Sequence, residues 1–122
     1  MIGYVTLGTK DLPRAVAFYD ALMKEMGAQR GFENERLVLW WRAPGTPGLG
    51  VCTPFDGNTA TIGNGDMVAL AAENREQVDA LYNKAIELGA TDEGAPGERF
   101  PGFYGGYFRD LDGNKLNFFF MG

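Results

Sequence analysis

The chain of 122 residues offers few side chains that could catalyse a reaction, because it contains no histidine. Histidine is the usual general base at neutral pH and a common ligand for zinc, nickel, iron and manganese. The single thiol, Cys52, has no imidazole to activate it, so we expect an inert, buried residue. Tyr4 would act as a hydrogen-bond donor rather than a base, because an unperturbed phenol has a pKa of about 10. These residue types favour binding over catalysis.

Three further kinds of side chain suit a binding site. The Asn117 amide both donates and accepts hydrogen bonds, so it would orient a carbonyl or hydroxyl group of a ligand, or else bond only to Tyr4. Met67 carries a soft, flexible thioether that suits an irregular cavity, although a methionine on a strand is more often part of the core. Trp40 and Trp41 are adjacent, so on a strand one would face the site and the other would pack outward. The sequence leaves open which of them faces the site.

These candidates belong to two similar halves of the chain. The strand-like segment 3–7 and the helix-like run after it reappear as segment 66–70 with a second helix-like run. Matching residues share a spacing of 63 positions: Val5 with Val68, Leu7 with Leu70, and Tyr19 with Tyr82. A duplicated module implies pseudo-twofold symmetry, so we expect Tyr4 and Met67 to face a shared cavity from opposite sides.

The first half reads as a βαβββ module. An alternating, β-branched segment at residues 2–8 predicts a strand, and Asp11 with Pro13 predicts the start of a helix that ends at Gly27. We expect three more strands, at about residues 28–33, 35–42 and 49–53. The polar, glycine-rich stretch 56–65 has no helical period and is predicted to be a linker.

The second half repeats this order. A strand from Asp66 precedes a helix capped by Asn74 and closed by Gly89, and further strands are expected near Thr91 and at about residues 104–109 and 115–121. Segment 94–102 has no P-loop lysine and leads into no helix, so we expect a flexible lid rather than a phosphate-binding loop.

Aromatic residues are frequent in the second half. On the last predicted strand, Phe119 shares a face with Asn117, whereas Phe118 and Phe120 point to the other face. Phe119 is therefore expected at the site. Further aromatic residues that extend this surface include Phe100, Phe103 and Tyr104.

Composition limits the partners of the protein. The net charge of −5, without clustered Lys and Arg, argues against nucleic acid and anionic membranes and slightly favours a cationic ligand. No apolar run approaches the ~20 residues that cross a bilayer, and no basic and apolar signal stretch precedes the first strand. One small cytoplasmic domain is expected.

Several motifs resemble the vicinal oxygen chelate superfamily of glyoxalases, bleomycin-resistance proteins and dioxygenases. They are the duplicated βαβββ pattern, the segment Asp-Leu-Pro-Arg-Ala-Val-Ala-Phe-Tyr-Asp at 11–20, and Arg-Asp-Leu-Asp-Gly-Asn-Lys at 109–115. The resemblance covers nearly the whole chain. It implies an α+β domain in which two tandem βαβββ modules form curled mixed sheets around a shared cleft, and it implies a homodimer. The fold alone does not select a reaction.

Enzymes of this superfamily hold a divalent metal with His, Glu or Gln on the first and last strands of each module. The resemblance places these positions at Tyr4, Met67 and Asn117, with the fourth close to Cys52. Hard cations prefer carboxylates and zinc prefers thiolate or imidazole, so we expect no metal, no cofactor and no catalytic residue. Phe100 stands where related sequences often have a histidine.

We therefore predict a protein of this superfamily that binds a small apolar or aromatic molecule in the cleft between its modules, without catalysis. Module one is expected at about residues 1–55 and module two at about 66–122. The predicted ligand-binding residues are Tyr4, Trp40, Trp41, Cys52, Met67, Phe100, Tyr104, Asn117 and Phe119. One alternative is a metal-dependent lyase, isomerase or dioxygenase with atypical ligands such as Glu33, Glu35, Asp66 or Glu73. Another is a structural or dimerisation module whose cleft is filled with side chains.

Overall fold

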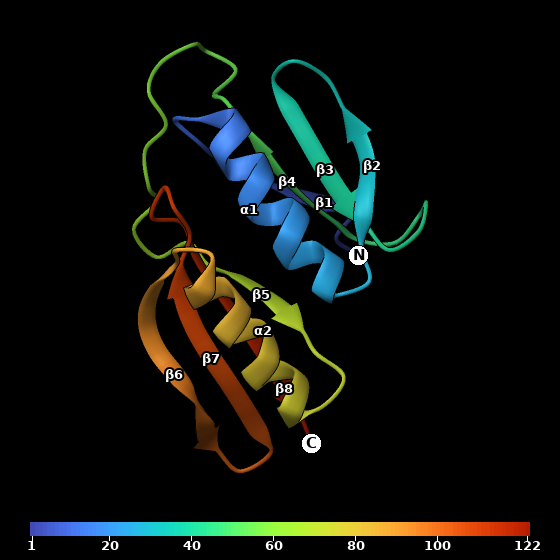
Figure 1. Ribbon diagram of the computed structural model, residues 1–122, viewed down its shortest axis with the longest axis vertical. Helices are drawn as coiled ribbons and strands as arrows, with labels where there is room; N and C mark the ends of the chain where they lie inside the picture. The colour runs from blue at the N-terminus through green and yellow to red at the C-terminus, as the bar shows by residue number, and fades with distance from the viewer. The chain divides into compact units, whose positions relative to one another are not determined.

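The computed structural model describes residues 1–122, which form two compact units, Met1–Ile62 and Gly63–Gly122 (Figure 1). Each unit contains one helix and one open, four-stranded mixed sheet in the chain order βαβββ. The predicted α+β fold of two tandem βαβββ modules is therefore confirmed. Neither helix is long and apolar enough to cross a membrane.

The first unit is built from β1 (Tyr4–Gly8), α1 (Leu12–Glu25), β2 (Gln29–Glu33), β3 (Leu37–Trp41) and β4 (Gly48–Cys52). Its sheet has the order β1-β4-β3-β2, in which β1 and β4 are parallel and the other pairs are antiparallel. The predicted cap is present, because the Asp11 side chain accepts a hydrogen bond from the Arg14 backbone N–H. Gly27 follows the helix at a φ of 75°, which suits glycine.

The helix α1 covers one face of this sheet (Figure 1). Its apolar side buries Ala15, Phe18, Tyr19, Leu22 and Met23. The sheet packs against this side of α1 through every second residue of β3 and β4: Val38, Trp40, Leu49 and Val51. Burying one such large apolar side chain contributes about 1.5–3 kcal/mol, so this layer supplies much of the stability of the unit.

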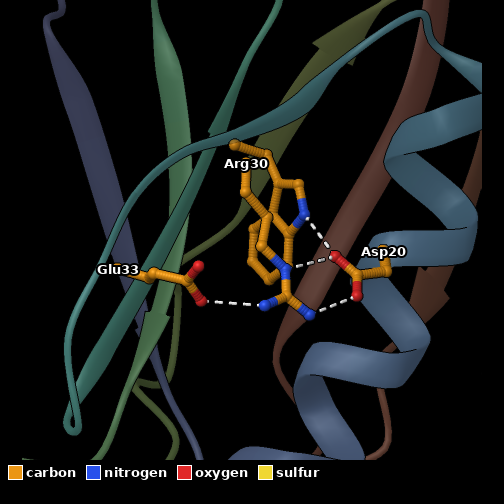
Figure 2. A network of polar contacts seen from close by, with 4 residues as sticks. Asp20, Arg30 and Glu33 are labelled. Carbon is orange, nitrogen blue, oxygen red and sulfur yellow. Dashed lines mark hydrogen bonds and ion pairs between the residues drawn. The ribbon is translucent and has the colours of Figure 1, made fainter.

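A polar network ties α1 to β2 and β3 (Figure 2). Both carboxylate oxygens of Asp20 accept hydrogen bonds from the Arg30 guanidinium, at 3.0 and 2.6 Å. The Trp40 indole N–H donates to the same carboxylate at 2.9 Å, and Arg30 also donates to Glu33 at 2.8 Å. The Arg30 guanidinium holds the pKa of Asp20 below its usual range, because its hydrogen bonds outweigh the opposing effect of burial.

The second unit is built from β5 (Val68–Ala71), α2 (Arg75–Glu87), β6 (Thr91–Phe100), β7 (Phe103–Arg109) and β8 (Lys115–Met121). Its sheet has the order β5-β8-β7-β6, and β5 and β8 are parallel. The predicted cap of α2 is confirmed, since the Asn74 side chain accepts a hydrogen bond from the Gln77 N–H at 2.7 Å. The helix packs on a face that buries Phe108, Leu116 and Phe118.

The prediction of a flexible loop at residues 94–102 was wrong, because most of this segment belongs to β6. The strand pairs with β7 through three register shifts, the first of them at Gly94, whose φ is 144°. Bulges of this kind absorb extra residues without ending the ladder, so glycine and proline here bend the strand instead of breaking it.

Tyr82 gives the second unit a measurable response to alkali. Its hydroxyl donates to Asp92 at 2.6 Å, and burial together with this hydrogen bond raises the pKa of Tyr82 to about 12. The unfolded chain ionises this phenol near pH ~10, so its contribution to stability is complete below that pH and is lost as the pH rises toward 12. We expect Tyr82 to ionise near pH 12 in an absorbance titration. Tyr82→Phe should remove absorbance change from that pH range; an unchanged titration curve would contradict the assignment.

Candidate functional site

Each sheet has a second face, turned away from the helix of its own unit, which we call its distal face. Side chains on a strand alternate between the two faces, so the face on which one side chain lies determines the faces of its neighbours. Trp40 is 2% exposed, lies 5.8 Å from Tyr19 between ring centroids and bonds Asp20, and it therefore faces α1. Trp40 is thus the tryptophan that packs on a helix, and Trp41 lies on the distal face.

The distal face of the first unit is apolar and contains small residues. The Trp41 indole lies directly against Gly31, where an added Cβ would overlap the ring. Tyr4 is 62% exposed, and β1 pairs it with Gly48. Cys52, a free and partly exposed thiol, alternates onto the same face. The structure therefore places three predicted site residues, Tyr4, Trp41 and Cys52, on this one face.

Strand register shows which residue of the first unit is equivalent to Asn117. Val5 pairs with Leu49, and its repeat equivalent Val68 pairs with Leu116. Leu49 is thus equivalent to Leu116, and the next residue, Gly50, is equivalent to Asn117. The position expected close to Cys52 is therefore Gly50, which has no side chain to offer a metal.

The distal face of the second unit carries the predicted Asn117 and Phe119. Along β8 the distal side chains are Lys115, Asn117, Phe119 and Met121, while Leu116 and Phe118 are fully buried against α2. The predicted alternation is confirmed. In β7, register places Arg109, Tyr107, Gly105 and Phe103 beside them in the same order.

Tyr104 lies on the opposite face from Asn117. Its hydroxyl donates to Asp79 of α2 at 2.6 Å, and the Arg75 guanidinium lies over its ring at 5.1 Å from the centroid. The hydrogen bond to Asp79, followed by burial, raises the pKa of Tyr104. Because Tyr104 and Trp40 are both engaged with helices, we leave them out of the site.

Three phenylalanines form a stack on this distal face. The rings of Phe100 and Phe103 lie 4.9 Å apart between centroids, and those of Phe103 and Phe119 lie 5.6 Å apart with an interplanar angle of 5°. Phe100 is 57% exposed, so the stack reaches the surface. Phe103 links the two predicted residues, and only the pairing of β7 with β8 shows that role. Met67 precedes β5 and is 43% exposed.

Asn117 is the unusual residue of this face. It is 1% exposed, yet its Oδ1 is a buried acceptor with no hydrogen-bond partner, the only such side-chain atom in the structure. Its neighbours in register are Ala69 on β5 and Tyr107 on β7, and a Cβ added to Gly105 would lie 3.7 Å from its Nδ2. An unsatisfied buried acceptor costs about 1–3 kcal/mol, so it requires an explanation such as an absent ligand group.

A pocket of about 360 Å³ in the first unit is less informative. It lies where the parallel strands β1 and β4 end and is lined by Thr9, Lys10, Thr53, Pro54 and residues 57–60. The Thr9 hydroxyl already donates to the Asp11 carbonyl and accepts from the Asp11 N–H. The amide of Asn58 donates to Asp56. These polar groups are satisfied within the protein, in contrast to Asn117.

The residues do not fit the divalent metal of the superfamily. Its four positions hold a phenol, no side chain, a thioether and an amide, at Tyr4, Gly50, Met67 and Asn117. No group of three or more Cys, Asp or Glu side chains is placed to hold a metal ion. Of the carboxylates considered as atypical ligands, Glu33 is already paired with Arg30 at 2.8 Å. Neither zinc nor a hard cation finds its preferred ligands here.

Comparisons with known proteins agree with the fold. The family model of the Glyoxalase/Bleomycin resistance protein/Dioxygenase superfamily matches residues 1–118. The chain belongs to this superfamily. A crystal structure of a glyoxalase/bleomycin resistance protein from Albidiferax ferrireducens T118 is 38% identical, with a TM-score of 0.88 over 98% of this chain and 97% of that chain.

Other similar solved structures share less sequence identity with the chain. A hypothetical protein from S. aureus is 27% identical, with a TM-score of 0.75 over 98% of this chain and 92% of that chain. A lactoylglutathione lyase from Agrobacterium tumefaciens is 21% identical, with a TM-score of 0.72 over 98% and 92% of the two chains, and this similarity shows the fold alone. A search of curated proteins finds no match.

Proposed function

We propose that this superfamily member binds a small, flat, apolar or aromatic molecule without a metal and without catalysing its conversion. The observation that carries the proposal is the buried, unpartnered Oδ1 of Asn117. A ligand N–H or O–H group would supply the missing donor. A hydrogen bond to a buried acceptor that is otherwise unpaired is worth about 1–3 kcal/mol, which corresponds to about a fivefold to a hundredfold change in affinity.

The neighbours of Asn117 support a flat ligand. Gly105 lies in register with Phe119, and Ala69 lies in register with Asn117, so small residues adjoin the amide on both flanking strands. The stacked rings of Phe103 and Phe119 offer a planar surface. Aromatic stacking adds about 0.5–1.5 kcal/mol beyond the burial of apolar area, which favours an aromatic molecule.

We also predict ligand contacts for the other residues of the site. Trp41 would stack on an aromatic ligand, Tyr4 would donate a hydrogen bond, and Cys52 and Met67 would provide apolar contacts. That the two distal faces share one cleft, that the chain forms a homodimer and that it acts in the cytoplasm also stay predictions.

The proposal is tested by comparing flat aromatic donors with their methylated counterparts. Indole, carbazole and 2-naphthol would be titrated into the protein beside 1-methylindole, 9-methylcarbazole and 2-methoxynaphthalene, and binding would be followed in amide NMR spectra. We expect the donors to shift the signals of Gly105, Phe119 and the Asn117 side chain. The methylated compounds should bind about tenfold more weakly or worse, because they cannot donate to Oδ1.

Asn117→Leu provides the matched control for this comparison. It should abolish the difference between each donor and its methylated counterpart, since the variant has no acceptor. Equal binding of both members of every pair by the unmodified protein would contradict the proposal, as would an absence of shifts near Asn117 with all three donors.

A further inference from the structure

Positive charge gathers at one end of the same distal face. Successive distal residues on β8 are Lys115, Asn117 and Phe119, which stand about 7 Å apart along a strand. The face thus changes from a cation to an amide and then to an aromatic ring. On β7, Tyr107 lies beside Asn117 and adds a second polar side chain at this level of the face.

Two cations each lie over the ring of Tyr107. The Arg99 guanidinium lies 5.3 Å from the ring centroid, and the Lys115 ammonium lies 5.7 Å from it. Arg99 donates a hydrogen bond to the Ala95 carbonyl, and neither cation forms an ion pair with a carboxylate. Arg109 differs, because its Nε bonds Glu93 at 2.6 Å. The charge of Arg99 and Lys115 is therefore uncompensated by the protein.

This arrangement is unusual in a chain with a net charge of −5. The overall charge favoured a cationic ligand, but charge close to a site outweighs distant, screened charge. Two unpaired cations beside a buried, unpartnered acceptor attract a molecule that has an anionic group close to a hydrogen-bond donor. The ring of that molecule would then lie toward the stack of Phe103 and Phe119.

We propose that the ligand is an aromatic acid whose carboxylate lies between Arg99 and Lys115, whose N–H or O–H donates to Asn117 Oδ1, and whose ring stacks on Phe119. The inference rests on the proposed function and names its ligand class. It also gives the ligand a direction along β8, with the acid toward Lys115 and the ring toward Met121.

The test uses three probes with one ring and one N–H group but different charge: indole-3-acetate, indole-3-acetamide and tryptamine. We expect the acid to bind about fivefold or more tightly than the neutral amide, and tryptamine to bind most weakly. Added salt should reduce the advantage of the acid, because partly exposed charges are screened. Lys115→Gln should remove most of that advantage, because it should weaken the binding of the acid much more than the binding of the amide.

Lys84→Gln is the matched control, because Lys84 lies on α2 and pairs with Glu87 away from the distal face. It should leave the preference for the acid intact. Binding of the amide with no preference for the acid, or a preference that survives Lys115→Gln, would overturn the inference while the proposed function stands. Tightest binding of tryptamine would also overturn it. An absence of binding by all three probes and by indole would overturn both proposals.

Discussion

Replacing Asn117 by leucine is expected to stabilise the protein by about 1–2 kcal/mol and to weaken the binding of flat aromatic donors by about tenfold or more. Leucine has the same branched skeleton as asparagine, with methyl groups in place of the amide oxygen and nitrogen, and it removes a buried acceptor that has no partner. In the unmodified protein, water hydrates the Asn117 amide in the unfolded chain, and folding leaves its oxygen unpaired. The leucine variant avoids that cost. A substitution that raises stability and lowers binding is the signature of a residue retained for its ligand.

Asn114 provides the matched control, because it is also buried in the second unit but is satisfied. Its Nδ2 donates to Asp110 Oδ2 at 3.0 Å, and its backbone N–H donates to Asp110 Oδ1 at 2.9 Å. Asn114→Leu leaves part of that carboxylate unpaired and should destabilise the protein by about 1–3 kcal/mol. Urea unfolding of both variants measures the two effects. A loss of stability in Asn117→Leu similar to that in Asn114→Leu would show that Asn117 is structural.

Asp20→Ala is expected to destabilise the first unit by about 1–4 kcal/mol. It leaves the N–H of the buried Trp40 without an acceptor, which costs about 1–3 kcal/mol, and it removes the partly exposed pair with Arg30, worth up to about 1 kcal/mol. Glu33→Ala is the control, because it removes only the other, more exposed carboxylate on Arg30 and should cost under about 1 kcal/mol. Unfolding curves followed by tryptophan fluorescence compare the variants, and equal losses would contradict the role of Asp20.

The dependence of this effect on pH provides an independent check. Because Arg30 lowers the pKa of Asp20 in the folded state, the carboxylate contributes its stability above the unfolded pKa and loses it as the pH falls through the lowered value. The stability difference between the unmodified protein and Asp20→Ala should therefore be largest near neutral pH and should shrink in acid. A difference that grows on acidification would refute the assigned direction.

The sequence predicted most of the fold because its signals were local. The caps Asp11 and Asn74 and the closing glycines Gly27 and Gly89 delimit the two helices, and the spacing of 63 residues reveals the duplicated module. Segment 94–102 was mispredicted because glycine and proline read as loop signals when the partner strand is unknown. In the structure β7 supplies that partner and bulges accommodate the extra residues.

The site was predictable only where alternation along one strand sufficed. The shared face of Asn117 and Phe119 followed from a period of two, whereas the choice between Trp40 and Trp41 required the contact with α1. The equivalence of Gly50 with Asn117 depends on pairing between distant strands. The unpartnered state of Asn117 and the unpaired cations over Tyr107 are properties of packing in three dimensions, which no local pattern encodes.

One calorimetric measurement tests most directly whether the protein binds its ligand without a metal at the superfamily's ligand positions. Indole would be titrated into metal-stripped protein, and the titration repeated with saturating zinc, nickel, manganese or ferrous iron. We expect the same affinity for indole in every case, because Tyr4, Gly50, Met67 and Asn117 do not form a suitable set of ligands. Binding of indole that appears only after a metal has been added would contradict the account and would indicate a metal site built from other residues.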